Sequence, residues 1–316
     1  MILSLISCFL LVTGAQHSEK SSLELKLSPI PNQVTRKSGF FSFGNNTVIV
    51  SQVGNSSDQY AGQQIKEEVL TDLGIKIGTG RVSRPRIIEL KRTAQPVSVQ
   101  DQGQGYRLDV ESQKITISAA TDDGIFYGVQ TLKQLIRGNR VNRVAIPACT
   151  IIDWPKLHYR GWQHDISRGP IPTLAFLKKE IRLLSEFKLN LFTLYTEHVF
   201  KLKKHPTIAP ADGITADEIK VLCAYGRKYH VEVVGNFQSF GHFTNILKVP
   251  GYRQLGENSD VISPAKEASY RFLNDVYSEI APAYDSHLFT INCDEVSGLG
   301  DGPSKDLVKK LGVAGV

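Results

Sequence analysis

The second half of the chain alternates short apolar runs with longer stretches in which apolar residues recur at the helical period. The predicted order is strand 159–166, helix 173–187, strand 190–196, helix 215–229, strand 231–238, helix 264–281 and strand 288–293. Near-continuous apolar strands separated by helices are typical of a parallel sheet that is buried on both faces. The pattern therefore predicts an α/β fold, either a doubly wound sheet or a (β/α)8 barrel.

The first half follows a different pattern, in which strands and helices are mixed. Strands are expected at 47–51, 86–90, 106–110 and 114–118, and helices at 60–73 and 121–136. The last two strands are close enough in sequence to form a hairpin. This half is predicted to be a small α+β domain over 29–152, with a boundary at Asp153-Trp154-Pro155. It contains no obvious catalytic constellation, so a structural role is expected for it.

The first residues have the outline of a secretory signal peptide. An apolar run at 2–12 is followed by small residues at 13–15, which predicts a signal peptide over 1–15 and a linker over 16–28. The protein is therefore expected to be secreted or otherwise exported, to a periplasmic, lysosomal or extracellular location. No later stretch reaches the ~18 apolar residues of a transmembrane helix, so stable membrane insertion is not expected.

Charge and cysteine content narrow the classes of function. The net charge of +6 comes from basic residues that are scattered along the 316 residues, so nucleic-acid binding is not expected. Three cysteines follow the predicted signal peptide, Cys149, Cys223 and Cys293, and their spacing fits neither a disulfide framework nor a zinc site. No metal or organic cofactor is indicated. Cys293 is interpreted as a small buried packing residue, with a nucleophile as the alternative.

Polar side chains gather where the predicted strands of the second half end. They are His164, Asp165 and Arg168, then Thr196, Glu197 and His198, then Asn236, Gln238 and His242, and finally Asp294 and Glu295. In both parallel architectures ligands bind at this edge of the sheet. Neighbours in a regular strand point to opposite faces, so Asp294 and Glu295 can share a pocket only where the strand unravels. The pair predicts an active site, with the start of a helix as the alternative.

Four short segments add a resemblance to this pattern. They are 121–136, Tyr159-Arg160-Gly161 followed by Asp165 and Arg168, Ser239-Phe240-Gly241-His242, and Cys293-Asp294-Glu295. In this order they resemble segments of the family 20 glycoside hydrolases, the β-N-acetylhexosaminidases, from about residue 25 to the end of the chain. The resemblance implies a small α+β amino-terminal domain followed by the first half of a (β/α)8 TIM barrel. Asp165 and Arg168 are expected to brace the first loop of that barrel.

The resemblance also implies a role for each candidate site residue. Glu295 would be the general acid that protonates the glycosidic oxygen and then the base that activates water. Asp294 would hold the substrate's own 2-acetamido group while its carbonyl oxygen attacks the anomeric carbon, with net retention. Arg160 would bind sugar hydroxyls, with an ion pair at the barrel rim as the alternative. His242 would lie at the edge of the site, and Glu197 would supply an acid after the second strand.

The length of the second half limits this interpretation. Only four strand-helix units follow residue 153, whereas a closed barrel needs eight units and typically ~250 residues. We therefore expect residues 153–316 to be the first four units of a truncated barrel and the chain to be a fragment of a longer enzyme. Two alternatives stay open, a hydrolase of the neighbouring O-GlcNAc-removing family and a non-catalytic carbohydrate-binding protein. The expected partners are glycans that contain N-acetylglucosamine or N-acetylgalactosamine; the preferred epimer and the oligomeric state stay open.

Overall fold

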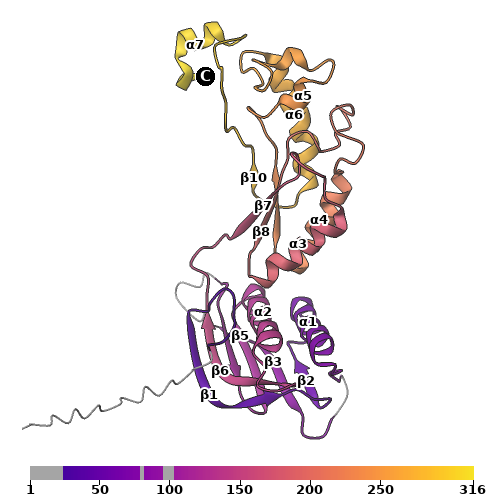
Figure 1. Ribbon diagram of the computed structural model, residues 1–316, viewed down its shortest axis with the longest axis vertical. Helices are drawn as coiled ribbons and strands as arrows, with labels where there is room; N and C mark the ends of the chain where they lie inside the picture. Colours follow the sequence, from indigo (N-terminus) through magenta and orange to yellow (C-terminus); the bar gives the residue numbers. More distant parts are fainter. Residues whose placement is uncertain (1–23, 79–81, 95–102) are drawn as a thin grey trace, which may run out of the picture.

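The computed structural model describes residues 24–78, 82–94 and 103–316, and Figure 1 shows them as two units stacked end to end. The predicted signal peptide, 1–15, and most of the predicted linker, 16–28, lie outside the described residues. Within the described ranges, no helix combines the length and the apolar character needed to cross a membrane.

The amino-terminal unit is a six-stranded sheet with the order β1-β6-β4-β5-β3-β2. Its elements are β1 (Gln33–Ser42), β2 (Thr47–Val50), α1 (Ser56–Leu73), β3 (Arg86–Arg92), β4 (Tyr106–Val110), β5 (Lys114–Ala119), α2 (Asp122–Gly138) and β6 (Ala145–Asp153). Helices α1 and α2 pack against each other and lie on the same side of the sheet (Figure 1). The unit is an α+β domain, as the sequence predicts.

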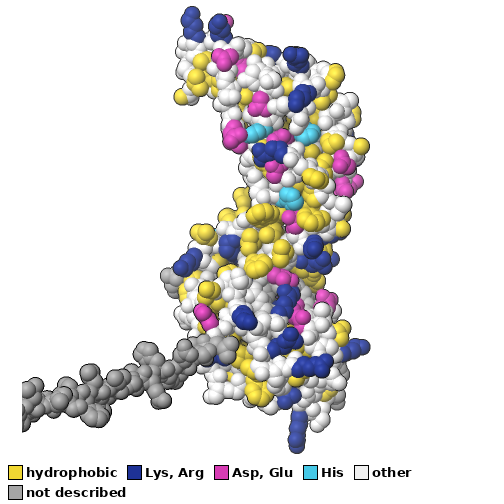
Figure 2. Space-filling view, viewed as in Figure 1, with side chains coloured by type: hydrophobic (Ala, Val, Ile, Leu, Met, Phe, Trp, Pro, Cys, Tyr) yellow, Lys and Arg dark blue, Asp and Glu magenta, His cyan; other side chains and the backbone are white. Residues whose placement is uncertain are grey.

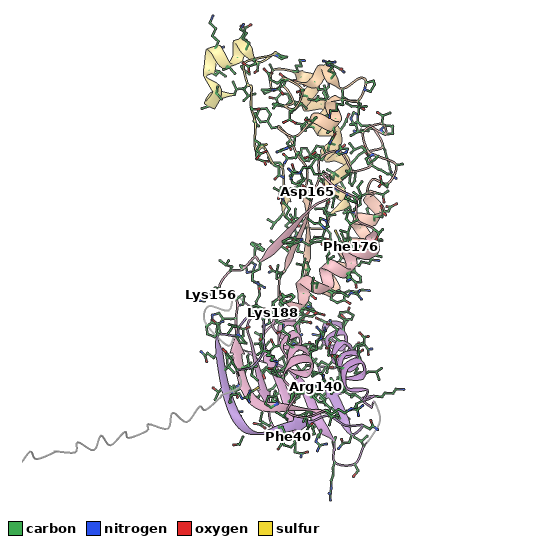
Figure 3. The ribbon with its side chains drawn as sticks, viewed as in Figure 1. Phe40, Arg140, Lys156, Asp165, Phe176 and Lys188 are labelled. Carbon is green, nitrogen blue, oxygen red and sulfur yellow. The ribbon has the colours of Figure 1, made fainter. Side chains whose placement is uncertain are left out.

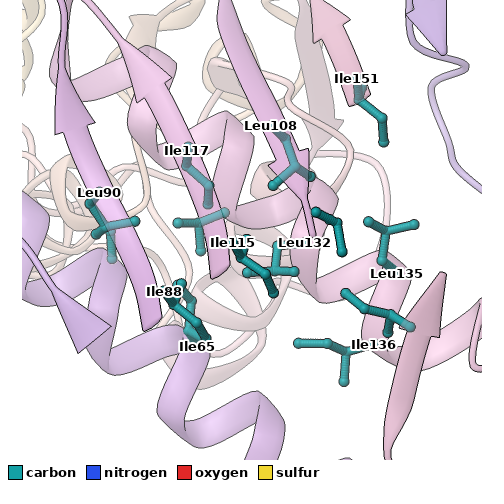
Figure 4. Packing of buried hydrophobic residues seen from close by; sticks show 14 of the residues in the cluster. Ile65, Ile88, Leu90, Leu108, Ile115, Ile117, Leu132, Leu135, Ile136 and Ile151 are labelled. Carbon is teal, nitrogen blue, oxygen red and sulfur yellow. The ribbon is translucent and has the colours of Figure 1, made fainter. Parts of the chain in front are cut away.

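The core of this unit lies between the sheet and the two helices. Ile115 and Ile117 of β5 pack in one cluster with Ile65 of α1 and Leu132 of α2, and all four side chains are fully buried (Figure 4). Alternate residues of a strand face one side of a sheet, so the spacing of the two isoleucines directs both toward the helices. Burial of these apolar side chains is the main source of stability of the unit.

The predicted hairpin is confirmed, because β4 and β5 pair antiparallel. Strands β1 and β6, by contrast, have no counterpart in the predicted pattern. Strand β1 is an edge strand whose residues are mostly exposed, so it lacks a continuous apolar signal. Strand β6 contains Pro147, which pairs with Phe40 next to the point where the register between the two strands shifts. A bulge tolerates the missing N–H of proline, and for that reason a proline does not end this strand.

The second unit is built on a four-stranded parallel sheet with the order β10-β9-β8-β7. Its elements are β7 (Gly161–Asp165), α3 (Leu174–Glu186), β8 (Leu191–Tyr195), α4 (Ala216–Lys228), β9 (Glu232–Asn236), α5 (Thr244–Leu247), α6 (Glu267–Ile280), β10 (Phe289–Thr290) and α7 (Lys305–Leu311). Helices α3 and α4 lie along one side of the sheet (Figure 1). The prediction of an α/β fold is confirmed, and the unit has the form of a partial barrel.

Strand β10 differs from the prediction of a buried strand over 288–293. Only Phe289 and Thr290 pair with β9, and Ile291 keeps 58% of its surface exposed. Among the described residues, β10 pairs with β9 on one side and has no strand on the other side. The spacing of apolar residues in the sequence does not show that one side of the strand is uncovered. Cys293 is exposed, and its interpretation as a buried packing residue is therefore wrong.

Candidate active site

Three acidic residues meet around one histidine at the carboxyl edge of the second sheet. His242 Nε2 lies 3.3 Å from Glu295 Oε2 and 3.6 Å from Asp294 Oδ2, while its Nδ1 lies 3.9 Å from Glu197 Oε1. Glu197 is 5% exposed, whereas the side chains of Asp294 and Glu295 are 57% and 76% exposed. The histidine therefore stands between one buried acid and two acids that a ligand can reach. Figure 2 shows histidine and acidic side chains gathered on this unit.

The adjacent carboxylates share this site because the chain leaves the extended conformation directly after β10. Asn292 and Glu295 have positive φ angles of 28° and 52°, and α7 begins only at Lys305. The alternative that the pair starts a helix is wrong. Positive φ is uncommon for residues other than glycine, and such conformations cluster at functional sites. His242 has a φ of 61°, so the segment that faces the pair is held in the same unusual region.

Gly241 allows the loop after β9 to lie directly against the acidic pair. A Cβ at this position would stand 2.6 Å from the backbone oxygen of Asp294, which is closer than a real Cβ contact. Backbone hydrogen bonds from Ser239 N–H to the Asn292 oxygen and from Phe237 N–H to the Thr290 oxygen hold the two segments together. The absence of a side chain at Gly241 therefore sets the distance between the histidine loop and the carboxylates.

A second set of contacts links Asp294 to Glu197 through neutral side chains. Gln238 is fully buried, and its Nε2 donates to Asp294 Oδ1 at 3.1 Å and to the Tyr195 hydroxyl at 2.8 Å. The Tyr195 hydroxyl donates to Glu197 Oε1 at 3.1 Å. The hydrogen bond from Gln238, helped by the proximity of His242, lowers the pKa of Asp294. Burial raises the pKa of Glu197, although Tyr195 and His242 oppose that rise.

The loop after β7 adds a cation to the same edge. Asp165 Oδ1 accepts the backbone N–H groups of Ser167 and Arg168, and its Oδ2 accepts Arg168 Nε at 2.5 Å. These bonds brace the loop, as the sequence predicts. The guanidinium of Arg168 also lies over the Tyr195 ring at 4.7 Å, and its side chain is 58% exposed. Arg168 is thus held beside the Tyr195 and Glu197 part of the site with part of its surface open to solvent.

Arg160 lies at the opposite end of β7. Its donors bind the backbone oxygens of Lys188, Leu157 and His158 at 2.7–2.9 Å and the Tyr127 hydroxyl at 3.3 Å. Tyr127 belongs to the amino-terminal unit, so these contacts join the two units. Carbonyl oxygens and a hydroxyl satisfy the guanidinium there, which leaves it bound in place by neutral partners.

The structure therefore corrects the expectation that Arg160 binds sugar, and it does not support the alternative of an ion pair at the barrel rim. Figure 3 shows Lys188 where the two units meet and Asp165 farther along the second unit. The strand between these ends separates Arg160 from the carboxylates. Of the candidate site residues, the structure brings together Glu295, Asp294, His242 and Glu197.

Three residues that contribute to the site were not predicted as site residues from the sequence. Gln238 was noted only as a polar residue at a strand end, Arg168 was expected to brace the first loop, and Tyr195 falls within a predicted strand. The signal that could have found them is their position at the carboxyl edge, which they share with the acids. Among the described residues, no group of three or more histidine, cysteine or acidic residues has the arrangement of a metal site.

Two curated proteins are similar to most of this chain. Among curated proteins, the chain is 26% identical to "Beta-hexosaminidase" of Porphyromonas gingivalis, over 93% of this chain and 42% of that protein. It is 27% identical to "Beta-hexosaminidase" of Vibrio furnissii, over 86% of this chain and 49% of that protein. The chain therefore spans less than half the length of these two relatives.

Solved structures show the same fold. The chitobiase of Flavobacterium johnsoniae superposes with a TM-score of 0.78 at 23% identity, covering 90% of this chain and 48% of that one. The exo β-N-acetylglucosaminidase of Vibrio harveyi, in complex with N-acetylglucosamine, gives a TM-score of 0.74 at 23% identity, covering 90% and 50%. At this level of identity the likeness concerns the fold.

Two family models divide the chain between them. The model described as "Glycosyl hydrolase family 20, domain 2" matches residues 24–154, and "Glycosyl hydrolase family 20, catalytic domain" matches residues 157–309. Both models describe one family, and it is not the neighbouring O-GlcNAc-removing family. The chain belongs to glycosyl hydrolase family 20.

Proposed function

We propose that the chain carries the catalytic carboxylates of a β-N-acetylhexosaminidase, which removes terminal non-reducing N-acetylhexosamine residues from β-linked glycans. The observation that carries the proposal is the pair Asp294 and Glu295, both accessible and both within 3.6 Å of His242. The names of the curated relatives, "Beta-hexosaminidase", support the same activity. The substrate would be a glycan that ends in N-acetylglucosamine or N-acetylgalactosamine.

The two carboxylates have different tasks in this mechanism. Glu295 gives its proton to the glycosidic oxygen as the bond from that oxygen to the anomeric carbon breaks. The carbonyl oxygen of the substrate's acetamido group forms the new bond to the same carbon, and Asp294 accepts a hydrogen bond from the acetamido N–H. Water then forms a bond to the anomeric carbon while it gives a proton to Glu295, and the bond from the acetamido oxygen to that carbon breaks. This step restores the acid and the acetamido group and retains the configuration. The lowered pKa of Asp294 keeps it ionised for this role.

The other charged residues of the site support binding and proton transfer. His242 lies 3.3 Å from Glu295 Oε2, within reach for a hydrogen bond that orients the acid. Arg168 replaces Arg160 as the proposed sugar-binding cation, because its partly exposed guanidinium stands at the carboxylate edge and its fork of donors suits paired hydroxyls.

The organisation of the whole protein is part of the proposal. Residues 29–152 would form the supporting domain, and residues 153–316 the first four units of a (β/α)8 barrel. The apolar run at 2–12 supports a signal peptide over 1–15 and an exported enzyme. Fusion of residues 1–28 to a reporter protein tests the signal peptide. The reporter should be exported and the first 15 residues removed, and a reporter that stays uncleaved would contradict this proposal.

The test of the activity is hydrolysis of the p-nitrophenyl β-glycosides of N-acetylglucosamine and N-acetylgalactosamine. Replacement Glu295→Gln should lower kcat/KM by about 10²- to 10⁴-fold, the usual contribution of general acid-base catalysis. Glu267→Gln is the matched control, since the Glu267 side chain is 77% exposed and lies on α6. Equal turnover by the protein and its Glu295→Gln variant would refute the proposal. Binding of the sugar without any hydrolysis would favour the non-catalytic alternative.

A further inference from the structure

Gln238 is a buried amide that touches the acid expected to handle the acetamido group. It follows β9 by two residues and has no exposed surface. Its two amide hydrogens are donated to Asp294 Oδ1 at 3.1 Å and to the Tyr195 hydroxyl at 2.8 Å. No donor among the described residues reaches its buried Oε1. The amide thus uses both hydrogens of its NH2 group within the site.

The orientation of this amide follows from its neighbours. The Tyr195 hydroxyl has one hydrogen, which it donates to Glu197 Oε1 at 3.1 Å, so its oxygen can only accept from Gln238. An ionised Asp294 likewise can only accept. Both neighbours therefore require the NH2 side of the amide, and the opposite orientation would place the amide oxygen against two acceptors.

We propose that Gln238 is a positioning residue for the reaction, which holds Oδ1 of Asp294 with an amide donor so that Oδ2 is left to receive the substrate's acetamido N–H. The proposal rests on the proposed function of Asp294. Hydrogen bonds from Tyr195 and Gln238 join buried Glu197 to Asp294, whereas Glu197 lies 3.9 Å from His242 Nδ1.

The other groups around Asp294 cannot replace this donor. His242 Nε2 lies 3.6 Å from Oδ2, which is a longer contact to the oxygen that faces substrate. Glu295 and Cys293 are the neighbours of Asp294 in sequence, and Glu197 lies on the other side of His242. An ionised Glu295 or Glu197 disfavours the ionised form of Asp294. Arg168 stands beyond Tyr195. The hydrogen bond from Gln238 is accordingly the largest influence that lowers the pKa of Asp294.

The test uses the chain as it exists and two replacements. Gln238→Met removes the donor at similar volume, and Gln238→Glu keeps the shape but presents a carboxyl oxygen to Asp294. The titration of Asp294 is followed by carbon-13 NMR of its carboxyl group, with the signal assigned by its loss in Asp294→Asn. Binding of N-acetylglucosamine thiazoline, a stable analogue of the cyclic intermediate, is measured by calorimetry between pH 4 and 8. Gln63→Met is the control, because it removes an exposed hydrogen bond from an amide to the Glu67 carboxylate within α1.

In both Gln238 variants the titration midpoint of Asp294 should move to higher pH. Thiazoline affinity should fall by about 10- to 100-fold, the usual effect of losing a hydrogen bond to a charged group, and the pH below which binding is lost should rise. The control should match the unaltered protein in all three measurements. A Gln238→Met protein that is less stable, yet keeps the titration of Asp294 and the pH dependence of binding, would show a packing role only and overturn the proposal.

The outcome for Gln238 can be separated from that for the proposed function. The NMR titration needs neither ligand nor turnover, so an unchanged Asp294 midpoint overturns the role of Gln238 even in a fully active protein. If the midpoint moves but the unaltered chain neither binds the thiazoline nor hydrolyses the glycosides, the proposed function of the chain fails, and the role of Gln238 in the reaction is overturned with it.

Discussion

Replacement of Gly241 by alanine tests whether the distance between the histidine loop and the carboxylates matters. The new Cβ would stand 2.6 Å from the backbone oxygen of Asp294 and 3.4 Å from that of Glu295. The nearest atom belongs to the backbone and is not the end of a flexible side chain, so relief requires the two segments to separate. The separation displaces the residues that carry the reacting carboxylates.

The size of the displacement follows from ordinary contact distances. A favourable contact needs the segments to move apart by about 0.9 Å, because the Cβ would stand 2.6 Å from the Asp294 oxygen and favourable separations between nonbonded heavy atoms begin near 3.5 Å. A misplacement of about 1 Å at a catalytic group can cost 10²-fold in rate. We expect kcat/KM and thiazoline affinity to fall by about 10- to 100-fold in Gly241→Ala. The free energy of unfolding should fall by about 1–3 kcal/mol, as for other overpacked sites.

Three measurements check this prediction. They are hydrolysis of the p-nitrophenyl glycoside, denaturant unfolding, and the NMR signals of the His242 ring, which contacts both carboxylates. Gly169→Ala is the matched control, because Gly169 follows β7 at the same edge and no atom lies within 4 Å of a Cβ built there. If Gly241→Ala left the His242 signals and the ligand affinity unchanged, or if Gly169→Ala had the same effect, the reasoning from the close contact would be refuted.

The remaining predictions concern the core, the two arginines and the buried acid. Ile117→Ala should lower the free energy of unfolding by about 2–5 kcal/mol in urea titrations, because Ile117 is fully buried; a loss below 1 kcal/mol would contradict this. Arg168→Gln should raise KM about tenfold or more with little loss of stability, whereas Arg160→Gln should lower the melting temperature with a smaller effect on KM; equal effects on KM would contradict the assignment. Burial raises the pKa of Glu197, so its contribution to stability is greatest at low pH and is lost as pH rises through the folded-state value. In Glu197→Gln this loss of stability above pH 4.5 should be absent. If the free energies of unfolding of the variant and of the unaltered protein fell in parallel from pH 4 to 7, the prediction would be refuted.

The elements that the sequence predicts well are those in which the apolar period continues without interruption. Helix α2 and strands β8 and β9 belong to this group. Strand β6 was missed because Pro147 interrupts the pattern of strand-forming residues in its sequence, and only the pairing with β1 shows that the proline lies next to a shift of register. The extent of β10 could not be predicted either, because Ile291 is as apolar as a buried residue although it is 58% exposed. Hydrophobic period reports which face of an element is apolar and does not report what covers it.

The same distinction applies to the site. The sequence predicted that Asp294 and Glu295 follow a strand and that Gln238 and His242 follow another, and parallel strands bring such ends together. The contact between Gln238 and Asp294 could not be predicted, because it depends on the positive φ angles of Asn292 and Glu295. Local conformations of this kind are set by the neighbouring segment and carry no periodic signal.

The direction of β7 distinguishes the two arginines as candidates for binding sugar. Arg160 precedes the first residue of β7, Gly161, and Arg168 follows the last, Asp165. Five residues of extended chain span about 16 Å at 3.3 Å per residue, so the two guanidinium groups begin from opposite edges of the sheet. In parallel sheets ligands bind at the carboxyl edge. Arg168 therefore starts on the side of the carboxylates, and Arg160 on the side of the amino-terminal unit, whose Tyr127 it binds.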